Sequence, residues 1–202
     1  MMHKKWISKE KHEWNLEPDA AAVERAAKLE FKDAVATYKL LANRGSILSM
    51  ANLGHRYEHR GIEDGGPDFT EAEAWYQKAV DCGSAVSTLP FGYFYLRKKD
   101  YTNAIRVFSI GADRGYAPST VRLAYFYANG IGVDRDLPWA ENLLRRAAKL
   151  KNIWAKIGLA EMYMKTEGNY LKVARGLCLI GVAAVQFRLE RRFNPDSERL
   201  KK

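Results

Sequence analysis

The sequence has few cysteines, and this scarcity limits the classes of protein to which it can belong. Only Cys82 and Cys178 occur in 202 residues, and no Cys-x-x-Cys or other metal-ligand spacing is present. Disulfide-rich secreted scaffolds and structural zinc modules both need more cysteines at closer spacing. We therefore expect buried or incidental thiols in a reducing compartment, because a free cysteine usually behaves as a small hydrophobic residue.

Long apolar runs are also missing. The most apolar stretch runs only from Leu177 to Val185. This is far shorter than the ~20 residues that a helix needs to span a bilayer. The N-terminal stretch carries cations but no apolar core of the kind that a secretory signal contains. These features predict a soluble, cytoplasmic protein without a membrane span.

Catalytic motifs are equally scarce. The glycine-rich turns at 61–66 and 130–132 follow no strand pattern, and no Gly-Lys-Ser/Thr accompanies them, so they do not fit a phosphate-binding loop. The Gly-x-Ser-x-Gly motif of a nucleophilic serine does not occur either. We therefore predict that the protein is not an enzyme and that it uses no cofactor.

The net charge of +9 is concentrated at the two ends of the chain. Residues 1–12 contain four lysines and one glutamate, and residues 186–202 contain six cations and three acids, so each end contributes +3. The rest of the chain is nearly balanced. Basic ends suit an acidic partner, although such ends are more often solvated tails.

What the sequence does contain is an internal repeat. Tyrosines recur at steps of 38, 32 and 36 residues, each preceded by an apolar and a small residue: Leu53-Gly54 before Tyr57, Phe91-Gly92 before Tyr95, Leu123-Ala124 before Tyr127 and Leu159-Ala160 before Tyr163. Alanines in the same register follow at Ala34, Ala72, Ala104, Ala140 and Ala174, mostly with a bulky residue three positions later (Thr37, Trp75, Val107, Leu143 and Leu177). Repeats of this length indicate a solenoid.

Each repeat unit predicts two helices. The apolar, small and tyrosine positions share one face of the first helix, and the alanine stripe marks the second, which ends at Gly45, Gly83, Gly115 and Lys151. The fold class is therefore an all-α, α/α superhelical solenoid of about five helix-turn-helix repeats with an extended C-terminal capping helix. We expect a basic lead-in at 1–17, units at 18–45, 46–83, 84–115, 116–151 and 152–185, and a basic extension and tail at 186–202.

These residues resemble the Sel-one-like repeat family, relatives of the tetratricopeptide repeats. Tyr127, Gly130, Gly132, Val133 and Asp136 match the family's loop, with Ala140 and Ala147-Ala148 following in register. Leu53-Gly54-x-x-Tyr57 and Ala72-x-x-Trp75-Tyr76-x-Lys78-Ala79 match as well. The resemblance covers about residues 46–182. It implies a non-catalytic adaptor or scaffold that binds another protein.

In this type of superhelix the first helices line the concave face. The positions that the repeat pattern leaves free there hold His55, His59, Tyr93, Arg97, Tyr125, Asn129, Glu161 and Lys165. Such a mixture of aromatic and charged side chains is typical of peptide-binding grooves. We predict these residues as contacts to a protein or peptide, with acidic partners among the candidates; ordinary solvation of a groove remains the alternative.

Three alternatives stay open. His55, Glu58 and His59 form an H-x-x-E-H pattern, which a zinc hydrolase could use, although no third ligand is identifiable. Nucleic acid, an unlikely partner, could bind through Lys4, Lys5, Lys9 and Lys11, Trp6 and Trp14, and the tail cations Arg188, Arg191, Arg192, Arg199, Lys201 and Lys202. A regulatory or toxin-neutralising role is a further candidate. The protein is either a monomer or a homodimer through its apolar C-terminal helix.

Overall fold

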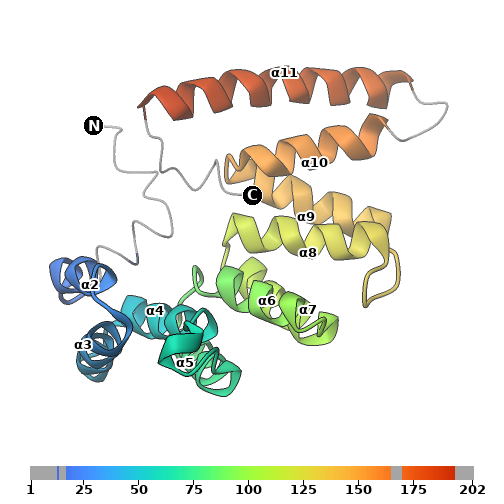
Figure 1. The fold of residues 1–202 in the computed structure, drawn as a ribbon. Coiled ribbons are helices and arrows are strands. Elements are labelled where there is room, and N and C mark those ends of the chain that lie inside the picture. The colour runs from blue at the N-terminus through green and yellow to red at the C-terminus, as the bar shows by residue number, and fades with distance from the viewer. Residues whose placement is uncertain (1–12, 14–16, 165–169, 194–202) are drawn as a thin grey trace. The chain divides into compact units, whose positions relative to one another are not determined.

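The structure is a computed structural model, and it describes residue 13 together with residues 17–164 and 170–193. Within that part of the chain every regular element is helical (Figure 1). The elements in order are α2 (Ala20–Ala27), α3 (Phe31–Asn43), α4 (Ile47–Glu58), the 3₁₀ turn η1 (Ile62–Asp64), α5 (Phe69–Asp81), α6 (Thr88–Arg97), α7 (Tyr101–Asp113), α8 (Ala117–Asn129), α9 (Leu137–Lys149), α10 (Ile153–Met164) and α11 (Tyr170–Phe193).

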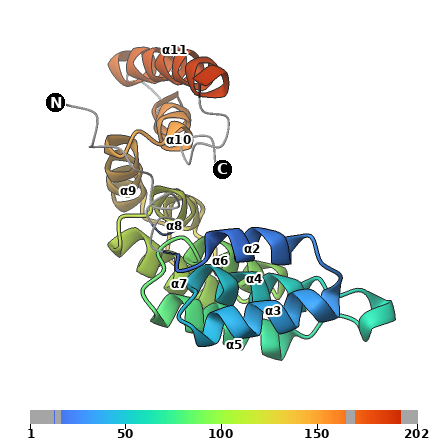
Figure 2. The same cartoon turned by 90° about the vertical axis from the view of Figure 1, so that its left-hand side faces the viewer.

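The chain forms two compact units, Met1–Asp100 and Tyr101–Lys202. In the first unit α4 packs on α3 and α5, and α6 packs on α5; Figure 2 shows α2 to α5 from the side. In the second unit α8 packs on α7 and α9, and α10 packs on α9 and α11. Ten α-helices packed as consecutive helix pairs confirm the predicted all-α repeat fold for the part of the chain that is described.

Short polar residues start the helices, and left-handed residues end them. The Asp68 and Asp136 side chains accept hydrogen bonds from Glu71 N and Trp139 N, at 3.0 and 2.8 Å, which satisfies amides that the first turn leaves unpaired. The predicted end at Gly83 has φ +97°, and Lys151 takes the same left-handed conformation at φ 61°. Gly45 and Gly115 follow the same pattern.

The core of the first unit depends on the close approach of α4 and α5. A Cβ added at Gly54 would lie 2.7 Å from the ring of Tyr76, so only glycine fits there. Tyr76 is fully buried, as are Leu53 and Ala72. The small position of the predicted repeat is therefore a packing requirement in this unit.

The C-terminal helix is extended, as predicted, but it does not bury its whole apolar surface. Gly176 and Ala183 are buried, whereas Leu177, Val182, Val185 and Leu189 are about half exposed. The packing of α11 on α10 therefore does not bury these four side chains. A homodimer in which a second copy of the chain covers them stays a prediction. Among residues 17–164 and 170–193, no helix has the length and apolar character needed to cross a membrane.

Candidate functional site

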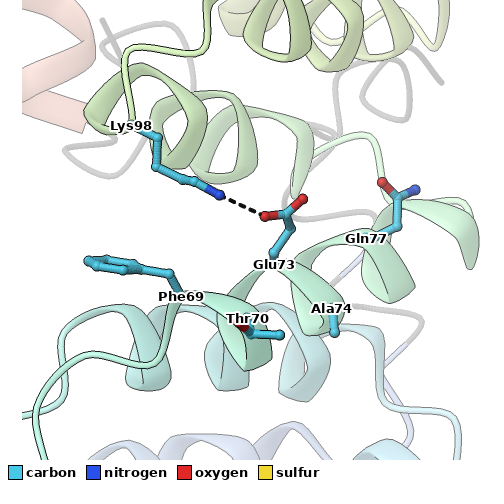
Figure 3. A pocket seen from close by; sticks show the side chains of 6 residues that line it. All are labelled: Phe69, Thr70, Glu73, Ala74, Gln77 and Lys98. Atoms are coloured by element: carbon cyan, nitrogen blue, oxygen red, sulfur yellow. Dashed lines mark hydrogen bonds and ion pairs between the residues drawn. The ribbon is translucent and has the colours of Figure 1, made fainter.

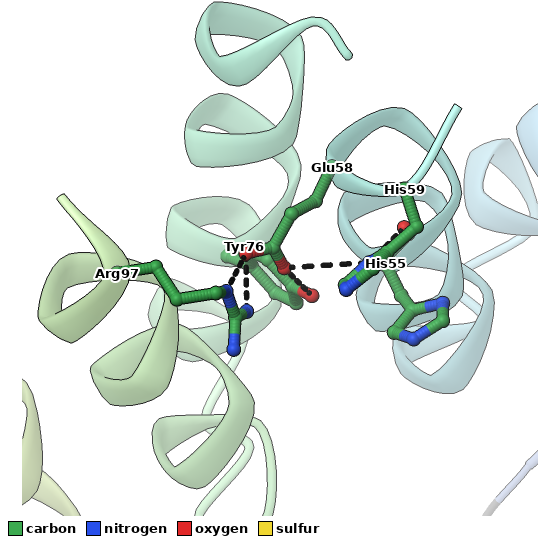
Figure 4. A network of polar contacts seen from close by, with 5 residues as sticks. All are labelled: His55, Glu58, His59, Tyr76 and Arg97. Carbon is green, nitrogen blue, oxygen red and sulfur yellow. Dashed lines mark hydrogen bonds and ion pairs between the residues drawn. The ribbon is translucent and has the colours of Figure 1, made fainter. Parts of the chain in front are cut away.

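Three of the predicted groove residues meet around one buried carboxylate. Glu58 is the last residue of α4, and its side chain is 3% exposed. Arg97, the last residue of α6, donates from Nε to Glu58 Oε1 at 2.6 Å and also from Nη2 to the same oxygen. His55 and His59 lie on the other side of Glu58 (Figure 4). We call His55, Glu58, His59, Tyr76 and Arg97 the Glu58 cluster.

Tyr76 anchors the cluster to the core. Its hydroxyl donates to Glu58 Oε2 at 3.0 Å, while its ring stacks on Phe91 at a centroid distance of 5.7 Å. Burial, the negative charge of Glu58 and this hydrogen bond all raise the pKa of Tyr76. The phenol therefore stays protonated and acts as a permanent donor to Glu58.

The two histidines form the exposed side of the cluster. Their rings stack at a centroid distance of 4.3 Å, and His59 Nδ1 lies 3.0 Å from the carbonyl oxygen of His55. Burial and the neighbouring His59 lower the pKa of His55, so the His55 imidazole is neutral at physiological pH. His59 Nδ1 is 3.8 Å from Glu58 Oε2, close enough for an ion pair when His59 is protonated.

The carboxylate and the guanidinium of the cluster differ in solvent exposure. Glu58 is buried, whereas the side chain of Arg97 is 51% exposed. A partner that approaches this surface therefore meets the guanidinium and two imidazoles, not the carboxylate. Because Glu58 fixes the guanidinium, less side-chain entropy is lost when a partner binds to it.

The remaining predicted residues are more scattered. Tyr93 is half-buried on α6, and Tyr125, on α8, is 54% exposed. Asn129 is exposed, and its side-chain amide donates to the carbonyl oxygen of Tyr125 at 2.7 Å within the same helix. Glu161 is exposed on α10, and Lys165 lies outside the described residues.

Sequence reasoning missed the central role of Glu58. It considered this residue only as the base of an H-x-x-E-H pattern, because its partners Tyr76 and Arg97 are 18 and 39 positions away. The structure uses the carboxylate as the acceptor for both partners, which explains the residue without a metal. No group of three or more His, Cys, Asp or Glu side chains suited to a metal occurs within the described part of the chain.

A cleft of about 460 Å³ opens beside α5 (Figure 3). Phe69, Thr70, Glu73, Ala74, Gln77 and Lys98 line it. Glu73 and Lys98 form an ion pair at 2.9 Å, and Glu73 also accepts a hydrogen bond from the Tyr95 hydroxyl at 2.9 Å. The two charged side chains of the cleft thus neutralise one another.

The two cysteine thiols are not buried, although burial was one of the two explanations expected for them. Cys82 and Cys178 are both free and exposed, so burial, the first of the two expected explanations, is wrong. Most of the cations proposed for nucleic acid binding, from Lys4 to Lys11 and from Arg199 to Lys202, lie outside the described residues. Arg188 is exposed on α11.

Comparison with known proteins identifies the repeats. The sequence profile described as "Sel1 repeat" matches residues 47–84 and 117–152, which contain α4 with α5 and α8 with α9. The chain is a Sel1-repeat protein. These proteins are related to the tetratricopeptide helical-repeat proteins, as the resemblance of the sequence implied. No curated protein sequence matches the chain.

Solved structures share the fold. A Sel1 repeat protein from Oxalobacter formigenes has a TM-score of 0.66 at 23% identity, and the match covers 88% of this chain and 79% of that one. A protective antigen of uropathogenic Escherichia coli with an SLR fold has a TM-score of 0.67 at 20% identity, covering 94% of this chain and 44% of that one. Both likenesses show an all-α superhelical repeat fold and nothing about a partner.

An immunity protein from Pseudomonas aeruginosa is more distant. Its TM-score is 0.43 at 17% identity, and the match covers 96% of this chain and 90% of that one. A score this low supports no argument about function. The toxin-neutralising role therefore stays a prediction from the sequence.

Proposed function

We propose that this Sel1-repeat protein is a non-catalytic protein-binding module, and that the Glu58 cluster binds a peptide segment of its partner. The observation that carries the proposal is the arrangement of Arg97, His55 and His59 around the buried Glu58. A fixed, half-exposed guanidinium beside two exposed imidazoles favours a carboxylate or a carbonyl oxygen, the groups that an extended or acidic peptide presents.

The energetics of the cluster support a binding role. A buried ion pair often contributes little to stability, since the cost of removing both charges from water offsets their attraction. The sequence nevertheless keeps Glu58 where α8, in the other unit, has Ala128 after the corresponding tyrosine. A costly polar arrangement that holds Arg97 in place at the surface is what a recognition site requires.

Tyr125, Asn129 and Glu161 form a second proposed contact set, in the unit 101–202. Tyr125 is the best anchor of the three, because an exposed aromatic ring supplies a large contact area with few rotatable bonds. We also propose a cytoplasmic location. The two free, exposed thiols support it, since a reducing compartment protects such thiols from oxidation.

The experiment uses the full chain as bait for a random peptide library displayed on phage. Selected peptides are synthesised, and their affinities are measured for the wild type, for the double variant His55→Ala/His59→Ala and for Tyr125→Ala. We expect the double variant to weaken binding about tenfold, which corresponds to about 1.4 kcal/mol. These side chains are exposed, so stability should change little.

Lys32→Ala serves as the matched control, because Lys32 is an exposed cation on α3, outside both contact sets. It should bind the selected peptides with wild-type affinity. The proposal fails if no peptide is enriched, or if the enriched peptides bind the wild type and both test variants equally well.

A further inference from the structure

Glu13 contacts the turn that precedes α6, more than seventy positions further along the chain. Its carboxylate accepts hydrogen bonds from Ser84 Oγ at 2.6 Å, from Ala85 N at 2.8 Å and from Val86 N at 3.0 Å. These donors lie in the turn of residues 84–87, which leads into α6 at Thr88. Backbone amides that a helix does not pair need another acceptor, and a carboxylate supplies one.

Glu17 makes a similar but weaker contact at the start of α4. Its Oε2 accepts a hydrogen bond from Leu48 N at 3.4 Å, a long distance for this type of bond. The other carboxylate oxygen, Oε1, is buried and has no hydrogen-bond partner among the described residues. A buried oxygen without a donor costs free energy, so Glu17 fills its position imperfectly.

The turn before α6 repeats the serine contacts that are found at the start of α4. Ser46 Oγ accepts from Ser49 N at 3.0 Å and contacts Ser49 Oγ at 2.6 Å. Ser84 Oγ accepts from Ser87 N at 2.9 Å and contacts Ser87 Oγ at 2.8 Å. We call the serine-capped start of α4 with Leu48, together with the turn before α6 with Ala85 and Val86, the helix-start edge. It lies at the opposite ends of α4 and α6 from Glu58 and Arg97.

We propose that the helix-start edge is a docking site for an acidic peptide with a Glu-x-x-x-Glu motif, and that Glu13 and Glu17 occupy it as an intramolecular ligand. Two carboxylates four positions apart in a partner helix share one face and can reach both parts of the edge. The chain's own segment has the same spacing. This site is independent of the Glu58 cluster.

The loose contact of Glu17 makes the segment displaceable. A partner carboxylate that approaches Leu48 N more closely than 3.4 Å forms a better hydrogen bond than Glu17 does. The covalent connection opposes it, because a tethered ligand has an effective concentration in the millimolar range. Weakening the two glutamates should therefore expose the edge to a peptide supplied in solution.

The test uses the full chain and a fluorescent peptide with the sequence of residues 6–19. Its affinity is measured by polarisation for the wild type and for the variant Glu13→Gln/Glu17→Gln. We expect the peptide to bind the variant about tenfold more tightly than the wild type, because the tethered competitor is weakened. A peptide in which the residues that correspond to Glu13 and Glu17 are replaced by glutamine should bind neither chain.

Glu24→Gln removes an exposed carboxylate of α2 and should behave as the wild type. His55→Ala/His59→Ala/Glu13→Gln/Glu17→Gln should keep the gain in peptide affinity, which separates this site from the proposed function.

Equal peptide affinity for the wild type and for Glu13→Gln/Glu17→Gln overturns the proposal. So does a variant that loses stability without binding the peptide, since the glutamates then act as structural caps only. A wild-type dimer in sedimentation that the Glu13→Gln/Glu17→Gln variant abolishes also overturns it, because the segment is then exchanged between copies.

Discussion

The repeats at 46–83 and 116–151 close their loops in the same way. Asp68 N donates to Tyr57 O, and Asp136 N donates to Tyr127 O, both at 2.9 Å. Each of these aspartates then caps the second helix of its own repeat. The family pattern therefore fixes the loop closure, although the two loops differ in length and only the first contains a 3₁₀ turn.

The same two repeats differ at three coupled positions inside the helix pair. The first has Gly54, Glu58 and Tyr76, and the second has Ala124, Ala128 and Leu144. Tyr76 needs glycine opposite its ring and an acceptor for its hydroxyl, and it finds both. Leu144 needs neither. The second repeat thus shows what packing alone requires, and the excess polarity of the first indicates where to look for function.

The largest effect should come from removing Arg97, the cation that pairs with Glu58 of the first repeat. Arg97→Ala leaves the buried Glu58 without its charged partner, and breaking such a pair costs about 3 kcal/mol. Adding Glu58→Gln to Arg97→Ala should recover most of this loss, since no buried charge remains. Urea denaturation measures both variants; a loss below about 1 kcal/mol for Arg97→Ala would show that Glu58 is solvated without it.

The next effect concerns the close approach of α4 and α5. Gly54→Ala should lower the free energy of unfolding by about 2 kcal/mol, because the new Cβ meets the buried ring of Tyr76. Combining it with Tyr76→Leu copies the second repeat at two of the three positions and should remove the steric part of the loss. Denaturation of the two variants and of Tyr76→Leu alone gives the coupling energy; additive losses would contradict the coupling.

The shared loop closure predicts equal, smaller effects in the two repeats. Asp68→Ala and Asp136→Ala each remove a side-chain acceptor from a helix start and should each cost about 1 kcal/mol. Thermal unfolding of the two variants measures both losses of stability. A loss confined to one of them would mean that the two loops are not equivalent in energy.

The smallest effect is a pH dependence that only the first repeat contains. Because the pKa of His55 is lowered, the unfolded chain takes up its proton first as the pH falls below about 6.5. Folding stability therefore decreases as the pH falls through this range and levels off below the lowered pKa. His55→Asn should show a shallower decrease in unfolding temperature between pH 7.5 and pH 5; an unchanged slope would exclude His55 as a source.

The sequence predicts the framework well because the framework is periodic. The left-handed ends at Gly45, Gly83 and Gly115 and the helix pairs follow from positions that recur from one unit to the next. Periodicity predicts less well which of two neighbouring positions is the buried one. Trp75, which is three after Ala72, fits the predicted stripe, yet it is only half-buried, whereas Tyr76 is fully buried. Positions three and four residues apart share a helix face, so the pattern alone does not separate them.

The sites were harder to predict because they depend on contacts between distant residues. His55, His59 and Arg97 are exposed, as the repeat register indicated. That they meet at Glu58 could not be predicted, because Arg97 lies on another helix, 39 positions after Glu58. The contact of Glu13 with Ala85 spans 72 positions and has no periodic signal at all. A single sequence shows which faces are free, and the structure shows which side chains share them.

The most direct test of this account is the affinity of a display-selected peptide for the wild type and for His55→Ala/His59→Ala, measured by calorimetry together with the unfolding temperature of each chain. The account predicts binding about tenfold weaker in the variant at an unchanged unfolding temperature. Equal affinities for the two chains would contradict it and would assign the Glu58 cluster to structure alone.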